Sequence, residues 1–554
     1  MEFGPVPSME SAGAILAHSV RVEGQAFKKG RVLSAQDAKA LSDAGIEIVT
    51  VCRLDADDVH EDEAANAIAH AARGPGISCS AAFTGRVNLN AERDGILIVD
   101  PDRIAELNVV DEGITFASLP PYSRVLARQM VATAKIIPFG VGRHNLDRAT
   151  PKSPMIEVRP FVAERFSLVQ TVLDSVKPKI LDKTEEILSA RFESLGASAL
   201  TPVRCPHTTA DLAAVLKDQV GVKPNAITIV GASAIVDRRD VIPSAIEAIG
   251  GTIRHFGMPV DPGNLLLLGD VGGIPVIGAP GCVRSPKPNG YDWVLERVAA
   301  GVPVDGRSIM AMGTGGLLKE IASRPLPRAK AVTDRAGKEP KPASDIEGGT
   351  FAPRIMGVLL AAGQSRRMGA RNKLLEDYSG APIVHHAGSA LRRSCISDIL
   401  VVLGHDADAV RSALDGLDAR FVHNTAYTDG MASSVRAATA AAPKDVDGIL
   451  FCLGDMPTIR PGTMDKLIAA FDPEEGRAIC VPTFEGQRGN PVLFSKRFFP
   501  EILDSSGDVG ARRLMERHPD DVAEVAVDDP GILLDIDTPD KLASLRDGGR
   551  KSDT

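Results

Sequence analysis

The sequence predicts an α/β protein in which a C-terminal, doubly wound and mainly parallel sheet follows an N-terminal mixed α/β region. Short apolar runs alternate with helical patterns from residue 355 onward, and such alternation indicates βαβ units. A similar βα alternation occurs at 166–325. Between the two lies a stretch rich in Pro, Lys and Gly at 322–353, and this composition is typical of a linker.

The composition limits the classes of function. The chain has 554 residues, 44% apolar and 24% charged, with a net charge of −9, as in a globular protein of several domains. An acidic chain without a long basic run is a poor match for nucleic acid, so we expect no nucleic-acid partner. The seven cysteines are scattered and never paired as C-x-x-C, so we expect neither a disulfide framework nor a zinc site. No signal-peptide pattern and no apolar run of about 20 residues are visible, so we expect a cytoplasmic protein without a membrane partner.

The patterns divide the chain into four segments. We expect an N-terminal mixed α/β region at 1–165, an α/β domain at 166–325, a linker at 326–353 and a C-terminal α/β domain at 354–546. The elements that we expect in the last domain are strands at Ile355–Leu360, Ile399–Leu403, Ile449–Leu453 and Ile479–Pro482, and helices at Pro382–Arg393 and Ala407–Leu417. In the second domain, Ala226–Val230 is expected to be a strand, followed by a loop, a helix and another strand.

A basic, glycine-containing loop follows the first C-terminal strand. Residues 358–375 read VLLAAGQSRRMGARNKLL. Gly363 and Gly369 allow the backbone to approach a ligand closely, and Arg366, Arg367 and Lys373 can neutralise phosphate oxygens. The spacing matches neither a Walker A loop nor a dinucleotide-binding loop. The alternatives are a solvated surface turn and an anion site at the carboxyl end of the sheet.

Two acidic groups are expected at the same edge of the sheet. Asp455 directly follows the apolar strand in GILFCLGDMPTI, and Asp535 and Asp537 lie two apart in LLDIDTPDKL. A strand-end aspartate can simply cap a helix. Two such clusters facing a basic loop instead favour a Mg²⁺-bridged triphosphate, because hard divalent cations prefer oxygen ligands.

Seven ordered segments then carry a family resemblance. Residues 355–545 resemble the nucleotidyltransferases of molybdenum cofactor biosynthesis, in particular the molybdenum cofactor cytidylyltransferases. The matching segments are Leu360–Gly369 (family pattern L-A-A-G-x-S-x-R-M-G), Asn372–Leu375, Gly430–Ala438, Gly454–Pro457, Gly486–Phe494, Gly507–Arg512 and Asp535–Pro539.

The resemblance implies a reaction and a set of residues. CMP is transferred from CTP to molybdate-loaded molybdopterin, which gives molybdopterin cytosine dinucleotide and pyrophosphate. The implied catalytic residues are Arg367, Lys373 and Asp455, and the implied Mg²⁺ ligands are Asp455 and Asp537. The implied nucleotide-binding residues are Leu360, Ala361, Ala362, Gly363, Ser365, Arg367, Lys373, Gly430, Ser433, Ser434 and Asn490.

Other activities and partners stay open at this point. The guanylyl branch usually shows L-A-G-G where this chain has L-A-A-G, which favours cytosine. The alternatives are a guanylyltransferase, a sugar-phosphate nucleotidyltransferase, or a non-catalytic molybdopterin carrier or chaperone. The expected macromolecular partner is a recipient molybdoenzyme or its chaperone.

The N-terminal half carries a second resemblance. Residues 231–246, GASAIVDRRDVIPSAI, resemble the G-G-x-S-x-G-D-x-D loop of molybdopterin-binding domains in molybdate insertases, with alanine and valine in place of two glycines. The implied molybdopterin site comprises Gly231, Ser233, Asp237, Asp240, Gly278, Pro280 and Gly281. Lost glycines restrict close backbone approach, so we expect pterin binding without molybdate insertion. The segment Ala12–Ala17 resembles the start of an insertase. This resemblance makes a homodimer through the N-terminal half a further expectation. The alternative is a plain strand–turn–helix with Asp240 at the helix start.

Several conspicuous side chains are not assigned to a site. Cys205 and His207 are expected to be loop or core residues, because no partner is identifiable for them. Trp293 is expected to anchor the core. His385 and His386 should point in different directions on their helix.

Overall fold

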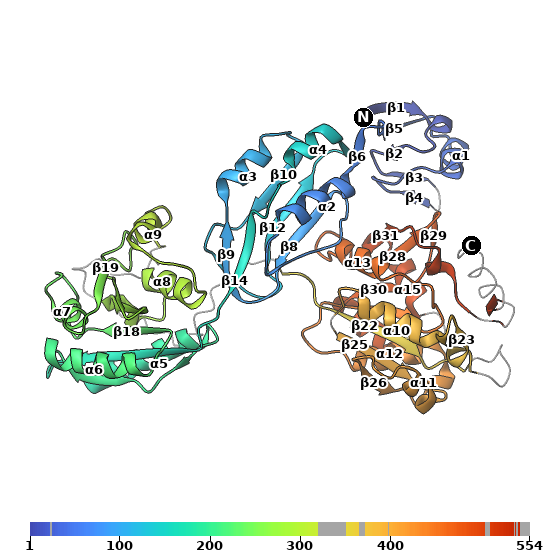
Figure 1. Ribbon diagram of the computed structural model, residues 1–554. Helices are drawn as coiled ribbons and strands as arrows, with labels where there is room; N and C mark the ends of the chain where they lie inside the picture. The colour runs from blue at the N-terminus through green and yellow to red at the C-terminus, as the bar shows by residue number, and fades with distance from the viewer. Residues whose placement is uncertain are drawn as a thin grey trace, which may run out of the picture.

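The computed structural model describes residues 1–22, 25–318, 351–364, 372–396, 398–504, 510–536, 538 and 541–542. Buried apolar side chains form separate cores along the chain, within 14–51, 59–158, 163–312 and 355–542. Figure 1 shows the corresponding bodies, with 165–318 in green at one end and 351–542 in orange and red at the other. Within the described residues, no helix has the length and apolarity needed to cross a membrane.

Residues 1–53 form a small unit in which β5 pairs antiparallel with β1 and β2. A capping box starts its helix, because the Ser34 hydroxyl accepts from the Asp37 amide while the Asp37 carboxylate accepts from the Ser34 amide. The elements are β1 (Glu2–Pro7), β2 (Ile15–Leu16), β3 (Val20–Val22), β4 (Gln25–Phe27), α1 (Ala35–Asp43) and β5 (Ile48–Arg53).

The next unit contains two antiparallel sheets, with strand orders β10-β12-β8-β7 and β11-β9-β14. Helix α2 buries its alanine-rich face in their shared core. The elements are β6 (Asp58–His60), α2 (Glu61–Ala72), β7 (Ile77–Cys79), β8 (Arg86–Ala91), β9 (Gly95–Val99), α3 (Pro101–Asn108), β10 (Ile114–Ser118), β11 (Arg124–Val125), β12 (Met130–Ile136), β13 (Gly140–Gly142), α4 (Arg143–Ala149) and β14 (Ile156–Pro160).

The third unit is built on one sheet with the order β16-β15-β18-β21-β20-β19, and β17 also pairs with β15. The predicted strand, loop, helix and strand at 226–256 are confirmed. The elements are β15 (Arg165–Val172), α5 (Pro178–Glu193), β16 (Ser198–Ala199), β17 (Val203–Pro206), α6 (Thr209–Gly221), β18 (Ala226–Val230), α7 (Val241–Ala248), β19 (Thr252–Phe256), β20 (Leu267–Val271), β21 (Ile274–Ala279), α8 (Gly290–Ala299) and α9 (Gly306–Met310).

The C-terminal sheet has the order β26-β25-β22-β27-β30-β28-β29, and β31 pairs with β28. The predicted strands are confirmed, whereas the helix expected at 407–417 ends at Ala413, where a turn through Gly416 (φ +80°) begins. The elements are β22 (Ile355–Ala361), β23 (Asp377–Tyr378), β24 (Ala381–Pro382), α10 (Ile383–Arg393), β25 (Asp398–Leu403), α11 (Ala407–Ala413), β26 (Arg420–His423), α12 (Met431–Ala440), β27 (Gly448–Leu453), α13 (Pro461–Ala470), β28 (Ile479–Phe484), β29 (Gln487–Arg488), β30 (Val492–Ser495), α14 (Phe499–Leu503), α15 (Gly510–Arg517) and β31 (Val522–Ala526).

Helices cover both faces of this sheet. Along β22, Leu359 and Ala361 join the core beneath α10 and α13, whereas Met356 and Val358 join the core beneath α12 and α14. Alternating side chains of a strand point to opposite faces, and a central parallel strand is therefore apolar on both. The pairs β22–β25, β22–β27 and β25–β26 are parallel, whereas β27–β30 is antiparallel. The doubly wound, mostly parallel sheet is thus confirmed.

The first and last units of the chain touch each other. Lys28 donates to the Val522 carbonyl at the edge strand β31, and burial lowers the pKa of its ammonium. Arg21 pairs with Asp520 at 2.9 Å. From the second unit, Phe83 packs against the C-terminal core, with the Arg477 guanidinium 5.8 Å from its ring centre. Figure 1 shows β3 and β4 above β29 and β31.

Candidate functional site

The strands that precede the predicted site residues end at one edge of the C-terminal sheet. Strand β22 lies between β25 and β27, and all three run in the same direction. Its end is held by the amide of Gly454, which donates to the Leu360 carbonyl at 3.0 Å. Parallel strands bring their carboxyl ends to a common edge, which is where ligands bind in such sheets.

A tight ion pair occupies this edge. Lys373 Nζ lies 2.5 Å from Asp455 Oδ2, and the two side chains are only 14% and 15% exposed. Asp455 follows β27, and Lys373 starts a short 3₁₀ helix capped by Asn372, whose side-chain oxygen accepts from the Leu374 amide at 3.1 Å. The Asn372 amide also donates to Asp406 at 3.2 Å. Two predicted catalytic residues, 82 positions apart in sequence, are thus in direct contact.

The second acidic segment lies against the first. The backbone N–H of Ile536 donates to the backbone carbonyl of Asp455 at 3.0 Å, and the backbone N–H of Asn490 donates to the carbonyl of Ile532 at 3.0 Å. Asn490 and Asp455 are therefore joined through residues 532–536. The Asp535 carboxylate pairs with Lys541 at 2.9 Å, and Asp537 lies outside the described residues.

The serines of the 430–434 turn are turned inward. Gly430, with φ +94°, begins helix α12, a conformation that favours glycine. Ser433 and Ser434 are 4% and 6% exposed, and their hydroxyls accept from the Asn424 amide at 2.8 and 3.0 Å. Sequence reasoning missed Asn424; its place directly after β26, at the same edge as Asp455, is the signal that could have found it.

The remaining predicted nucleotide contacts divide by burial. Leu360 is half-buried, and Ala361 and Ala362 are buried. Within the described residues, no atom lies within 4 Å of the position that a Cβ on Gly363 would take. Predicted residues Ser365 and Arg367, with Arg366 and Gly369, lie outside the described residues.

The described side chains offer a simple oxygen site for a metal ion. No group of three or more His, Cys, Asp and Glu side chains is gathered within the described part of the chain. Asp455 does supply a carboxylate at a ligand-binding edge, next to the cation of Lys373. Mg²⁺ in triphosphate sites is typically held by one or two carboxylates together with substrate oxygens. The residues present therefore fit Mg²⁺ brought with a nucleotide.

A second strand-end arrangement exists in the third unit. Strands β15, β18 and β21 are parallel, and Val230 is in register with both Gln170 and Ala279. Gly278, Pro280 and Gly281 thus reach the edge where the 231–236 loop begins, as expected. Arg284 joins the two loops, because its guanidinium donates to the Gly231 carbonyl at 2.8 Å.

The loop after β18 has its own internal contacts. Asp240 caps helix α7 by accepting from the Val241 amide at 2.7 Å, which is the role foreseen by the strand–turn–helix alternative. Asp237 pairs with Arg239, which lowers the pKa of the Asp237 carboxyl to about 2. Ser233 is exposed. Among the predicted acidic residues, Asp240 therefore acts in helix capping.

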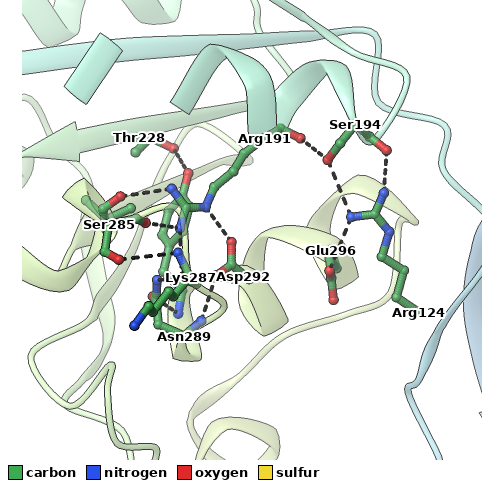
Figure 2. A network of polar contacts seen from close by, with 11 residues as sticks. Arg124, Arg191, Ser194, Thr228, Ser285, Lys287, Asn289, Asp292 and Glu296 are labelled. Carbon is green, nitrogen blue, oxygen red and sulfur yellow. Dashed lines mark hydrogen bonds and ion pairs between the residues drawn. The ribbon is translucent and has the colours of Figure 1, made fainter. Parts of the chain in front are cut away.

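Arg191 on α5 holds the loop that follows β21. Its guanidinium donates to the carbonyls of Val283 (2.9 Å), Ser285 (2.7 Å) and Lys287 (3.2 Å), and pairs with Asp292 at 2.7 Å. Figure 2 shows this network. Burial raises the pKa of the Asp292 carboxyl, whereas Arg191 opposes that rise. These contacts with Arg191 of α5 hold in place the loop that bears Arg284.

His207 lies in the loop after β17 and Cys205 is buried, as expected, and the structure adds a partner for His207 that the sequence did not identify. Its Nδ1 lies 2.8 Å from the Thr171 hydroxyl oxygen. The same oxygen accepts from the Ala232 amide at 2.9 Å. Thr171 and His207 are 36 positions apart, and only the pairing of β15 with β17 brings them together. Trp293 packs against the core as predicted, and the rings of His385 and His386 contact separate carbonyls.

In doubly wound sheets, ligands bind beyond the carboxyl ends of the parallel strands, and the Lys373–Asp455 pair lies at that edge. The family model of the MobA-like NTP transferase domain matches residues 357–522. Through this C-terminal region, the chain belongs to the MobA-like NTP transferase family. A second model, of a domain of unknown function, matches residues 5–53.

Characterised relatives match the same third of the chain. Nicotine blue oxidoreductase of Paenarthrobacter nicotinovorans is 30% identical over 203 residues, which are 36% of this chain and 99% of that protein. The purine catabolism protein PucB of Bacillus subtilis is 30% identical over 208 residues, 35% of this chain and 97% of PucB. Among solved structures, Rv0371c of Mycobacterium tuberculosis is 33% identical, covers 36% of this chain and 100% of its own, and has a TM-score of 0.32.

Proposed function

We propose that the chain is a CTP:molybdopterin cytidylyltransferase that releases pyrophosphate and forms molybdopterin cytosine dinucleotide. Three features support the proposal: the family match at 357–522, the L-A-A-G pattern at Leu360–Gly363, and the strand-end edge. The observation that carries it is the Lys373–Asp455 pair, because it places a cation and a hard oxygen ligand where a triphosphate would lie.

In the proposed reaction, a terminal phosphate oxygen of molybdopterin attacks the α-phosphorus of CTP. The new P–O bond forms as the bond to the β-phosphate breaks, and pyrophosphate leaves. Positioning and charge neutralisation supply most of the rate enhancement in such a displacement. In this proposal, Lys373 exchanges its contact with Asp455 for a contact with a phosphate oxygen. Asp455, with Asp537, would hold Mg²⁺, which supplies further neutralisation of phosphate charge when bound.

The supporting residues have positioning roles in this proposal. Asn424 holds Ser433 and Ser434, which order the start of α12 near the nucleotide. Ser365 and Arg367 are proposed to bind the triphosphate from the basic loop, and Asn490 to face the nucleotide or the pterin.

The N-terminal half is proposed to bind molybdopterin at the 231–236 and 278–284 loops. The insertase-like sequence pattern and the convergence of these loops support this assignment. We keep the division at 1–165, 166–325, 326–353 and 354–546 as part of the proposal. A tether between two pterin sites would raise the local concentration of the intermediate to the order of millimolar.

The test is pyrophosphate release by the purified full chain with molybdate-loaded molybdopterin and Mg²⁺. CTP, GTP, ATP and UTP are supplied in separate reactions. We expect release with CTP, its loss in Asp455→Asn, and its retention in Asp418→Asn, which changes an exposed carboxylate. Equal use of GTP would refute the cytosine assignment. Tight pterin binding without turnover on any nucleotide would instead support a carrier. The Paenarthrobacter relative's name denotes a redox activity, but the match to the NTP transferase family model favours transfer.

A further inference from the structure

We propose that His207 is a positioning residue that acts through Thr171 to fix the Gly231–Ala232 peptide, and so orders the 231–236 loop for its ligand. This inference rests on the proposal that the loop binds molybdopterin. The sequence pattern gave neither His207 nor Thr171 a role at this loop. Their contacts at the strand ends are the basis of the inference.

Both sides of one peptide bond are held. The carbonyl of Gly231 accepts from Arg284 at 2.8 Å, and the amide of Ala232 donates to the Thr171 hydroxyl at 2.9 Å. These two groups belong to the same peptide plane, so the two bonds together fix its rotation. Gly231 is needed at this point, because a Cβ there would lie 2.5 Å from the Ser233 carbonyl oxygen.

The Thr171 hydroxyl is itself held by the His207 ring. Thr171 is 1% exposed, so a missing hydrogen-bond partner would not be replaced easily by water. His207 supplies that partner at 2.8 Å. The His207 backbone is anchored to the same strand, because its amide donates to the Val172 carbonyl at 2.9 Å. His207 therefore sets the orientation of the hydroxyl that holds Ala232.

The hydroxyl has limited hydrogen-bonding capacity, which links the ring to the loop. A threonine hydroxyl offers one donor and two acceptor sites. One acceptor site takes the Ala232 amide. When His207 accepts at Nδ1, the hydroxyl hydrogen is used; when Nδ1 donates, that hydrogen is available to an oxyanion. The ring thus determines whether the hydroxyl hydrogen is committed to His207.

Beyond the held peptide, the loop opens outward. Ser233 and Ala234 are exposed, whereas Ile235 is buried in the core beneath β18. The loop is therefore anchored at both ends, by the Gly231–Ala232 peptide and by Ile235, with its polar tip presented at the edge. Loss of the first anchor should free the tip without unfolding the sheet.

The test compares Thr171→Val and His207→Phe with their conservative counterparts Thr171→Ser and His207→Asn, all in the full chain. Hydrogen exchange of the 231–236 peptide reports the loop, and the slowing of that exchange as molybdopterin is added gives the affinity of this site separately from the C-terminal one. We expect the first two variants to speed exchange and weaken binding roughly three- to tenfold, the size of one neutral hydrogen bond. The conservative variants should stay within about twofold on the same scale. Thr208→Val, which removes the cap of α6, is the control for general destabilisation and should change neither.

Each outcome decides one part of the inference. Unchanged exchange in His207→Phe would refute the positioning role, whatever the ligand. Faster exchange with unchanged affinity would refute the link between loop order and binding. Failure of the unmodified chain to bind molybdopterin would refute the pterin assignment of this half, while the exchange data would still decide the role of His207.

Discussion

Replacing either member of the Lys373–Asp455 pair should destabilise the C-terminal unit far more than an exposed ion pair would. At the observed 2.5 Å, an effective dielectric constant of about 20 gives an attraction of about 7 kcal/mol. Desolvation offsets much of this gain, but removing one partner leaves the other charge poorly compensated, which costs about 3 kcal/mol. We expect that loss in Asp455→Asn and in Lys373→Met. The double variant leaves no unpaired charge, so it should lose less than either single variant rather than the sum of about 6 kcal/mol.

The assay must follow the correct part of the chain. Trp293 is the only tryptophan and lies in the third unit, so its fluorescence would not report this pair. Hydrogen exchange of the 448–455 peptide in the full chain gives the local free energy of opening. Lys541→Met, which removes an exposed pair with Asp535 at 2.9 Å, is the control and should cost less than about 1 kcal/mol. Single losses below about 0.5 kcal/mol, or losses that simply add, would refute the reasoning.

Three further changes test other parts of the structure. Burial raises the pKa of the Glu296 carboxyl from 4.5 to about 7 despite Arg124 nearby. Its contribution to the free energy of unfolding is therefore complete below pH 4.5 and is lost as the pH rises through 7, by about 3 kcal/mol. Glu296→Gln should flatten this dependence of the unfolding free energy on pH, measured by Trp293 fluorescence. An unchanged dependence would show that Glu296 is not its source. A Cβ at Gly489 would lie 2.4 Å from the Ile532 carbonyl, so Gly489→Ala should shift Asn490 and raise the KM for CTP about tenfold, whereas Gly462→Ala, which meets open space, should not. Asn424→Ala leaves two buried hydroxyls without their donor and should cost about 2 kcal/mol in thermal unfolding, with no loss counting against the inward role of the serines.

The sequence was most informative where local pattern and topology agree. The four C-terminal strands and the strand–loop–helix–strand at 226–256 follow from apolar runs bounded by turn residues. The contact between Gly454 and Leu360 follows because neighbouring parallel strands end at the same edge of the sheet, the edge where ligands bind. The helix from Ala407 was predicted too long, because apolar spacing continued into a glycine turn that ends it.

Long-range pairing is what the pattern could not supply. Thr171 and His207 meet only because β17 pairs with β15, and no local signal in either segment encodes that pairing. Asn424 looks like an ordinary loop residue until β26 is placed beside β25. Asp240 carried a family pattern, yet its position before α7 makes capping its local role. Side-chain partners across a sheet depend on register, which a single sequence does not specify.

The contact between Lys28 and β31 gives the polypeptide the topology of a closed loop. Residues 1–53 contact the edge of the C-terminal sheet, and Phe83 of the second unit also packs against the C-terminal core. An otherwise exposed edge strand is also shielded from pairing with other chains. Residues 1–53 thus protect the C-terminal sheet from pairing with other chains along β31.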